Sequence, residues 1–133
     1  MYRAIKNSRQ INMGLSANEL RIGNLISYFN NDVLKVSAVF ENGIHDEQYN
    51  GYEYNDIHPI LLTDEWLSKC GFAKEDENNF ILHQNNIYFR VHRNLISGEF
   101  MCKLVNNYSF LIKSVHNLQN LYFSITNVEL TVA

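Results

Sequence analysis

The chain has 133 residues and a mass of 15.6 kDa, which is enough for one hydrophobic core of moderate size. Its composition, 46% hydrophobic and 19% charged, is that of a globular protein, and no apolar run approaches the roughly 18 residues that a membrane-spanning helix needs. The net charge of −3 argues against a broad phosphate-binding surface, and two cysteines 32 residues apart indicate a reducing cytoplasm without a disulfide framework.

The first 18 residues are basic, with no acid and three cations, Arg3, Lys6 and Arg9. Their charge of +3 leaves −6 for the rest of the chain. We interpret residues 1–18 as a flexible arm, or as a translated leader ahead of a start at Met13. A single α+β domain is expected to follow over residues 19–133.

Asparagines recur between β-rich segments, at Asn30-Asn31, Asn85-Asn86 and Asn106-Asn107. Because Asn tolerates the positive φ angles of tight turns, each of these positions predicts a β-hairpin.

The first predicted hairpin joins Arg21–Phe29 to Val33–Phe40. Alternation along both segments predicts a shared buried face. Its expected members are Leu25, Ser27, Phe29, Leu34, Val36, Ala38 and Phe40. The Tyr-rich residues 44–57 are expected to continue as a further strand or a long loop.

A short helix is predicted between Thr63 and Gly71. Thr63 is a suitable N-cap, and Asp64 and Glu65 in the first turn interact favourably with the positive end of the helix dipole. Gly71 is expected to end the helix. The apolar stripe of this helix is Trp66, Leu67 and Cys70. The acidic run Glu75-Asp76-Glu77 is interpreted as a solvated loop.

The second hairpin has the clearest alternation. A two-residue turn at Asn85-Asn86 pairs Gln84 with Ile87 and His83 with Tyr88. One face then carries only apolar side chains, namely Phe80, Leu82, Ile87, Phe89 and Val91. The other face carries Ile81, His83, Tyr88, Arg90 and His92. This pattern predicts one buried and one solvated face.

The third hairpin, Glu99–Val105 with Tyr108–Lys113, is apolar on both faces and is therefore expected in the middle of the sheet or beneath a helix. A second helix is predicted over Val115–Ile125, capped by Ser114 and ending near Asn127. Its apolar stripe is Val115, Leu118, Leu121, Tyr122 and Ile125. The predicted fold is thus α+β, a curved antiparallel sheet of three hairpins with two short helices. In one form of this fold, the N-terminal half resembles a small barrel.

No catalytic set can be assembled from the sequence. His45, Asp46 and Glu47 are adjacent, but neighbours in a strand point to opposite faces, so no metal site is predicted. Cys70 and Cys102 lie in apolar segments and behave as small hydrophobic residues. We therefore expect no enzyme activity, no metal and no cofactor.

Two surfaces are candidates for binding. The solvated face of the second hairpin offers amphipathic side chains, His83, Tyr88, Arg90 and His92, of the kinds enriched at interfaces. The second helix has no charged residue between Ser114 and Val128. The residues outside its apolar stripe therefore indicate a surface that a protein partner covers. These residues are His116, Gln119 and Phe123. The alternative is a helix buried on two sides.

Four ordered motifs resemble a family of small uncharacterised proteins encoded by phages and prophages of anaerobic gut bacteria. They are Glu19-Leu20-Arg21-Ile22-Gly23-Asn24, Pro59-Ile60 with Leu62-Thr63, Glu65-Trp66-Leu67 with Gly71-Phe72, and Val115-His116 with Leu118–Phe123, Thr126 and Glu129-Leu130. Leu61 stands where the family is expected to have proline, and Asn117 where it is expected to have glutamine. The resemblance spans residues 19–130 and implies no activity. A chain rich in Asn, Ile, Tyr and Phe and poor in Ala, Gly, Pro and Arg also indicates AT-rich coding DNA.

Three functions follow as hypotheses. The first is a non-enzymatic phage or prophage accessory protein in the host cytoplasm, which binds a host or phage protein and inhibits a host or defence protein. The second is a nucleic-acid or nucleotide binding module that uses the solvated face of the second hairpin. The third is a minor virion component. No membrane partner is expected.

Overall fold

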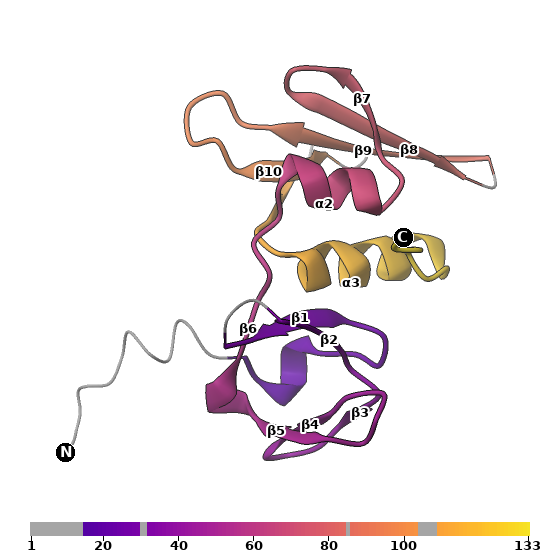
Figure 1. Cartoon of the computed structure of the whole chain (residues 1–133). Coiled ribbons are helices and arrows are strands. Elements are labelled where there is room, and N and C mark those ends of the chain that lie inside the picture. The colour runs from indigo at the N-terminus through magenta and orange to yellow at the C-terminus, as the bar shows by residue number, and fades with distance from the viewer. Residues whose placement is uncertain (1–14, 30–31, 85, 104–108) are drawn as a thin grey trace. The chain divides into compact units, whose positions relative to one another are not determined.

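A computed structural model describes residues 15–29, 32–84, 86–103 and 109–133 (Figure 1). The chain divides into two compact units, residues 1–60 (unit 1) and residues 61–133 (unit 2), where the sequence predicts one domain. The α+β class is confirmed, with eleven strands and two α-helices in the described residues. The described strands form three antiparallel sheets, where the sequence predicts a curved antiparallel sheet of three hairpins.

Unit 1 contains two three-stranded sheets made of short strands. The order in one sheet is β2-β1-β6, and in the other it is β3-β4-β5. The strands are β1 (Leu25–Tyr28), β2 (Asp32–Lys35), β3 (Ala38–Val39), β4 (Gly43–His45), β5 (Gly51–Glu53) and β6 (Ile57–His58). Two 3-10 turns, Ala17–Glu19 and Tyr54–Asp56, precede β1 and β6. The Tyr-rich segment therefore forms β4, β5, a helical turn and β6 in place of one strand or loop, and the described strands of unit 1 remain two sheets, not one closed barrel.

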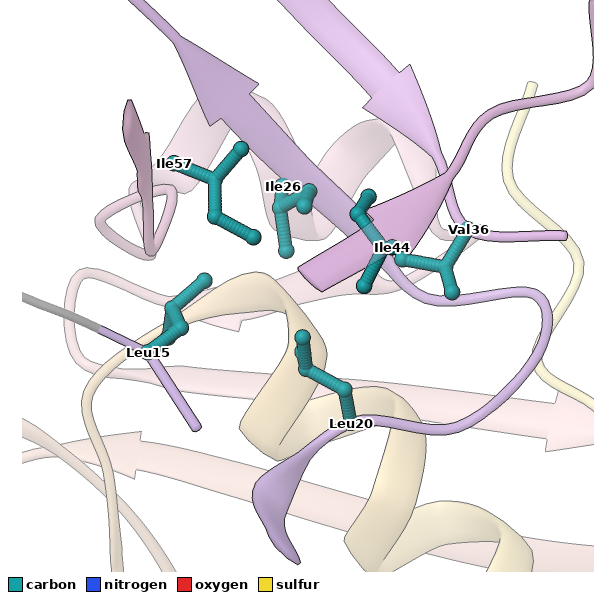
Figure 2. Close-up of a cluster of buried hydrophobic side chains, with 6 residues drawn as sticks. All are labelled: Leu15, Leu20, Ile26, Val36, Ile44 and Ile57. Atoms are coloured by element: carbon teal, nitrogen blue, oxygen red, sulfur yellow. The ribbon is translucent and has the colours of Figure 1, made fainter. Parts of the chain in front are cut away.

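The core of unit 1 is a cluster of six aliphatic side chains, which Figure 2 shows converging from several elements. Its members are Leu15, Leu20, Ile26, Val36, Ile44 and Ile57. Because Leu15 is buried there, residues 15–18 are packed into unit 1 and do not belong to a flexible arm. Residues 1–14 lie outside the described part of the chain.

The predicted buried face of the first hairpin is partly wrong. Phe29 and Phe40 are 64% and 49% exposed, whereas Ile26, which the alternation placed on the other face, is fully buried. Phe29 follows β1 at a positive φ of 45°, so it no longer obeys the alternation of the strand. Val36 follows β2 and is buried, and its backbone hydrogen-bonds to Gly23 and Asn24, the residues just before β1.

Unit 2 contains a five-stranded antiparallel sheet in the order β11-β10-β9-β8-β7 (Figure 1). The strands are β7 (Ala73–Asp76), β8 (Asn79–Gln84), β9 (Ile87–Arg93), β10 (Phe100–Lys103) and β11 (Ser109–Ile112). The predicted register of the second hairpin is confirmed, with Gln84 opposite Ile87 and His83 opposite Tyr88. Asn86 has the positive φ (64°) that the turn requires. The other predicted turn asparagines, at positions 30, 31, 85, 106 and 107, lie outside the described residues.

The edges of this sheet differ from the sequence predictions in two ways. The acidic run is not a loop, because Glu75 and Asp76 are in β7, which pairs with β8 through an irregular register. The third hairpin is not in the middle of the sheet, because β11 ends the sheet in the described residues, although Phe100, Cys102 and Ile112 are buried on one face as the alternative beneath a helix predicts. Its Phe110 and Leu111 are consequently 45% and 43% exposed.

Both predicted helices are confirmed, as α2 (Asp64–Lys69) and α3 (Val115–Thr126). The Thr63 hydroxyl accepts a hydrogen bond from the Trp66 amide at 3.2 Å, and Asn127 ends α3 in the left-handed conformation. In the part of the chain that the structure describes, no helix is long and apolar enough to cross a membrane.

The two helices lie on the same side of the unit 2 sheet (Figure 1). The side chains that β8 and β9 direct to this inner face, Phe80, Leu82, Phe89 and Val91, are buried. The Phe89 ring packs edge-on against Phe72 at 6.2 Å and against Tyr122 of α3 at 5.3 Å, measured between ring centroids. Burial of each side chain of this kind contributes about 1.5–3 kcal/mol, so these rings stabilise the packing of the sheet against α3.

Candidate functional site

The candidate site is the outer face of the unit 2 sheet, opposite α2 and α3 (Figure 1). We define this outer face by the solvated side chains of the second hairpin, Ile81, His83, Tyr88, Arg90 and His92. Three of them, His83, Tyr88 and Arg90, are exposed, and the other two are half-buried. A regular register fixes their positions, so the site lies on a rigid element.

His83 and Tyr88 form a stacked pair on the outer face. They lie directly opposite each other on β8 and β9, and their rings are parallel within 5° at a centroid distance of 4.0 Å. Opposed positions bring side chains into contact, and aromatic contact adds to the stability of such a pair. Tyr88 remains 64% exposed, so the stack holds a large amphipathic side chain in place without covering it.

Arg90 continues the same face and is paired with an acid. Its guanidinium lies 3.4 Å from a carboxylate oxygen of Glu75 on β7. Both side chains are partly exposed, and an ion pair in such a position is worth only about 0–1 kcal/mol. Glu75 therefore reduces the positive charge of the outer face without locking Arg90 in place.

His92 lies at the other end of β9, where a hollow of about 750 Å³ opens between the β7–β8 turn and the β9–β10 loop. The hollow is lined mainly by polar side chains, including Asp76, Asn79 and Arg93. Several are already engaged: Arg93 forms two contacts of 2.9 and 3.0 Å with the Asp64 carboxylate of α2. His92 is thus on the same face as Tyr88 but borders a different environment.

The predicted residues of α3 are placed differently. His116 and Gln119 are 1% and 3% exposed, so neither presents a surface to a partner in this structure, and Phe123 is half-buried. His116 Nδ1 lies 3.0 Å from the Ser114 hydroxyl that caps α3. The alternative of a helix with more than one buried face therefore describes α3 better than an exposed interface. The structure does not bring its residues together with the outer face.

The described residues contain no cluster of three or more His, Cys, Asp or Glu side chains that could hold a metal ion. Asp46, considered as a ligand from the sequence, accepts hydrogen bonds from the Gln48 and Asn50 amides and the Tyr52 hydroxyl. Its carboxylate therefore organises a loop of unit 1. Burial raises the pKa of the Cys70 and Cys102 thiols to about 11, which keeps both protonated and poorly nucleophilic at neutral pH.

One feature of unit 2 was missed from the sequence, the loop between β9 and β10. At its tip Leu95 and Ile96 are 81% and 97% exposed. The signal was present, because an apolar pair between Asn94 and Gly98 places hydrophobic side chains in a segment with turn-forming ends.

A scan against protein-family models, a search of curated proteins and a search of solved structures each found no match to this chain. The resemblance to phage and prophage proteins therefore stays a prediction.

Proposed function

We propose that the protein is a non-enzymatic binding protein that docks a protein partner on the outer face of the unit 2 sheet. The observation that carries the proposal is the exposed Tyr88, held against His83 on a rigid sheet face that the helices of unit 2 leave uncovered. Tyrosine and arginine are the residue types that most often dominate binding energy at protein interfaces.

The distribution of charge supports a protein partner. Arg90 and Glu75 place opposite charges side by side on this sheet, so the surface suits a mixed polar and aromatic contact more than a uniformly anionic one. Because Tyr88 is already ordered by its stack, little side-chain freedom is lost when a partner binds.

The setting that we propose is a phage or prophage protein acting in the bacterial host cytoplasm, where it inhibits a host or defence protein. The family resemblance and the composition typical of AT-rich genes support this setting. A minor virion component is the alternative, and mass spectrometry of purified particles distinguishes the two. Abundant protein in particles would contradict the cytoplasmic role.

The test is capture of a host protein by the tagged full chain, with and without nuclease, followed by binding measurements with the captured partner. We expect Tyr88→Ala to weaken binding about tenfold or more, because exposed anchor residues of this type contribute on the order of 2 kcal/mol. The matched control is Tyr49→Asn in unit 1, which removes a tyrosine that is 80% exposed and keeps a residue type that tolerates its φ of 66°. Equal affinity of Tyr88→Ala and the control would contradict the proposed surface.

A second candidate, binding of single-stranded nucleic acid, is favoured by the same stack. The exposed face of Tyr88 could stack a base, and the β9–β10 register continued by one residue sets Lys103 beside Arg90. This function requires affinity for a labelled oligonucleotide that falls with rising salt and with Arg90→Ala. Recovery of the partner despite nuclease, with no such salt dependence, would favour the protein partner.

A further inference from the structure

The β9–β10 loop forms a rigid apolar ridge. The Asn94 side-chain oxygen accepts hydrogen bonds from the Ile96 and Ser97 amides at 2.8 and 3.0 Å, and the Asn94 carbonyl accepts one from the Gly98 amide at 2.8 Å. Gly98 adopts a φ of 77°, which few other residues adopt without strain. The loop is therefore held in one conformation while Leu95 and Ile96 point into solvent. Two adjacent aliphatic side chains held outward in this way form a small exposed apolar patch.

An apolar hollow of about 290 Å³ adjoins this ridge. Its apolar lining comes from Leu61, Leu62, Phe100 and Ile112. Two opposite charges, Glu99 on the loop and Lys113 after β11, also line it. The volume is at the lower limit of small-molecule sites, which suits one or two aliphatic side chains better than a ligand.

Two hollows thus flank the loop, and they differ in character. The larger one, beside His92, already has Leu95 and Ile96 of the same chain in its wall, together with seven polar or charged side chains. The smaller one offers four apolar side chains. The same two side chains of a second copy, Leu95 and Ile96, therefore fit the smaller hollow.

We propose that two copies of the chain form a two-fold dimer in which Leu95 and Ile96 of each copy enter the apolar hollow of the other. A two-fold interface must be self-complementary, and a ridge beside a hollow that fits it meets this condition. The charges agree with the arrangement, because an inserted loop carries Glu99 toward Lys113 of the receiving copy. This dimer is independent of the partner proposed for the outer face.

The first test is sedimentation velocity of the purified full chain over a wide range of concentrations. We expect the average mass to rise from 15.6 kDa toward twice that value. Ile96→Asp should raise the dimer dissociation constant about tenfold or more, because it places a charge in the apolar hollow. The matched control is Ile22→Asp in unit 1, at a position that is 65% exposed, and it should dimerise like the unaltered chain. A monomer at every concentration, or dimerisation of Ile96→Asp equal to the control, would overturn the proposal.

The second test uses charge reversal. Glu99→Lys and Lys113→Glu should each weaken the dimer, and the double variant should restore it, because the opposite charges then face each other again. Both side chains are exposed, so circular dichroism should show an unchanged fold. A double variant no better than the single ones would overturn the two-fold arrangement. Tyr88→Ala should leave the dimer intact, which separates this result from the test of the outer face.

Discussion

The two units of this chain are similar in length but are stabilised in different ways. Unit 1 surrounds six aliphatic side chains with very short strands, and one buried carboxylate holds a connecting loop. Unit 2 packs aromatic side chains of a five-stranded sheet against two helices. Its acidic side chains are exposed, apart from Asp64, which is partly exposed and forms an ion pair with Arg93.

The difference concerns which contacts fix the fold. In unit 1 the Asp46 carboxylate accepts hydrogen bonds from two backbone amides and from the Tyr52 hydroxyl, each at 2.9 Å. In unit 2 the packing of the Phe72 and Tyr122 rings against Phe89 holds the elements together instead. Unit 1 should therefore respond most to changes in backbone geometry and charge, and unit 2 to changes in side-chain volume.

The largest expected effect is that of Phe89→Ala in unit 2. Loss of a buried ring that contacts Phe72 and Tyr122 should lower the free energy of unfolding by about 3–5 kcal/mol. The neighbouring Tyr88→Ala should lower it by no more than about 1 kcal/mol, because that ring is mostly exposed. Denaturant titrations followed by the fluorescence of Trp66, the single tryptophan, report on unit 2. Equal losses from the two substitutions would contradict the division of the sheet into a buried and a solvated face.

The next effect tests the backbone of unit 1. A Cβ atom at Gly43 would collide with the Tyr52 carbonyl of the paired strand, so Gly43→Ala must disrupt the pairing of β4 and β5. We expect a loss of about 3 kcal/mol, at the upper end of what overpacking costs. Gly51→Ala is the control, since a Cβ there would lie at an ordinary 3.6 Å from the His45 ring. Hydrogen exchange should show lost protection in β3, β4 and β5 for Gly43→Ala alone, and equal protection in both variants would contradict this account.

The features that the sequence predicted well depend on local rules. The register of β8 and β9 follows from strict alternation around a two-residue turn, and the structure confirms every pair that this rule gives. The helix starts follow from Thr63 and Ser114, whose hydroxyls each accept a hydrogen bond from an amide three residues later. In both cases the deciding contacts lie close together in the chain.

The features that it did not predict depend on tertiary context. Strands of two to four residues in unit 1 are too short for alternation to define a face, so the predicted buried face leaves out Ile26, which is fully buried. A charge-free helix is compatible with an interface or with burial, and only the packing shows that His116 is buried. The candidate surface on the second hairpin could be predicted because it is local, whereas the ridge at Leu95 needed the loop geometry.

The smallest of the three effects is a pH dependence of unit 1. Burial alone would raise the pKa of Asp46, but hydrogen bonds from Asn50, Tyr52 and Gln48 outweigh it and hold that pKa below its usual value of 3.8. The unfolded chain therefore binds a proton at higher pH than the folded one. The stabilisation by Asp46 is complete above about pH 4 and is lost as the pH falls through the lower pKa of the folded state.

Asp46→Asn should consequently destabilise unit 1 at neutral pH, and the difference from the unaltered chain should shrink as the pH approaches 2. Thermal unfolding followed by circular dichroism between pH 2 and pH 7 measures this difference. Glu41→Gln, which neutralises an exposed acid of the same unit, should change the unfolding temperature little at any pH. A difference between Asp46→Asn and the unaltered chain that stays constant across this range would show that the carboxylate acts through shape alone. Unit 1 would then resemble unit 2 in depending on packing instead of charge.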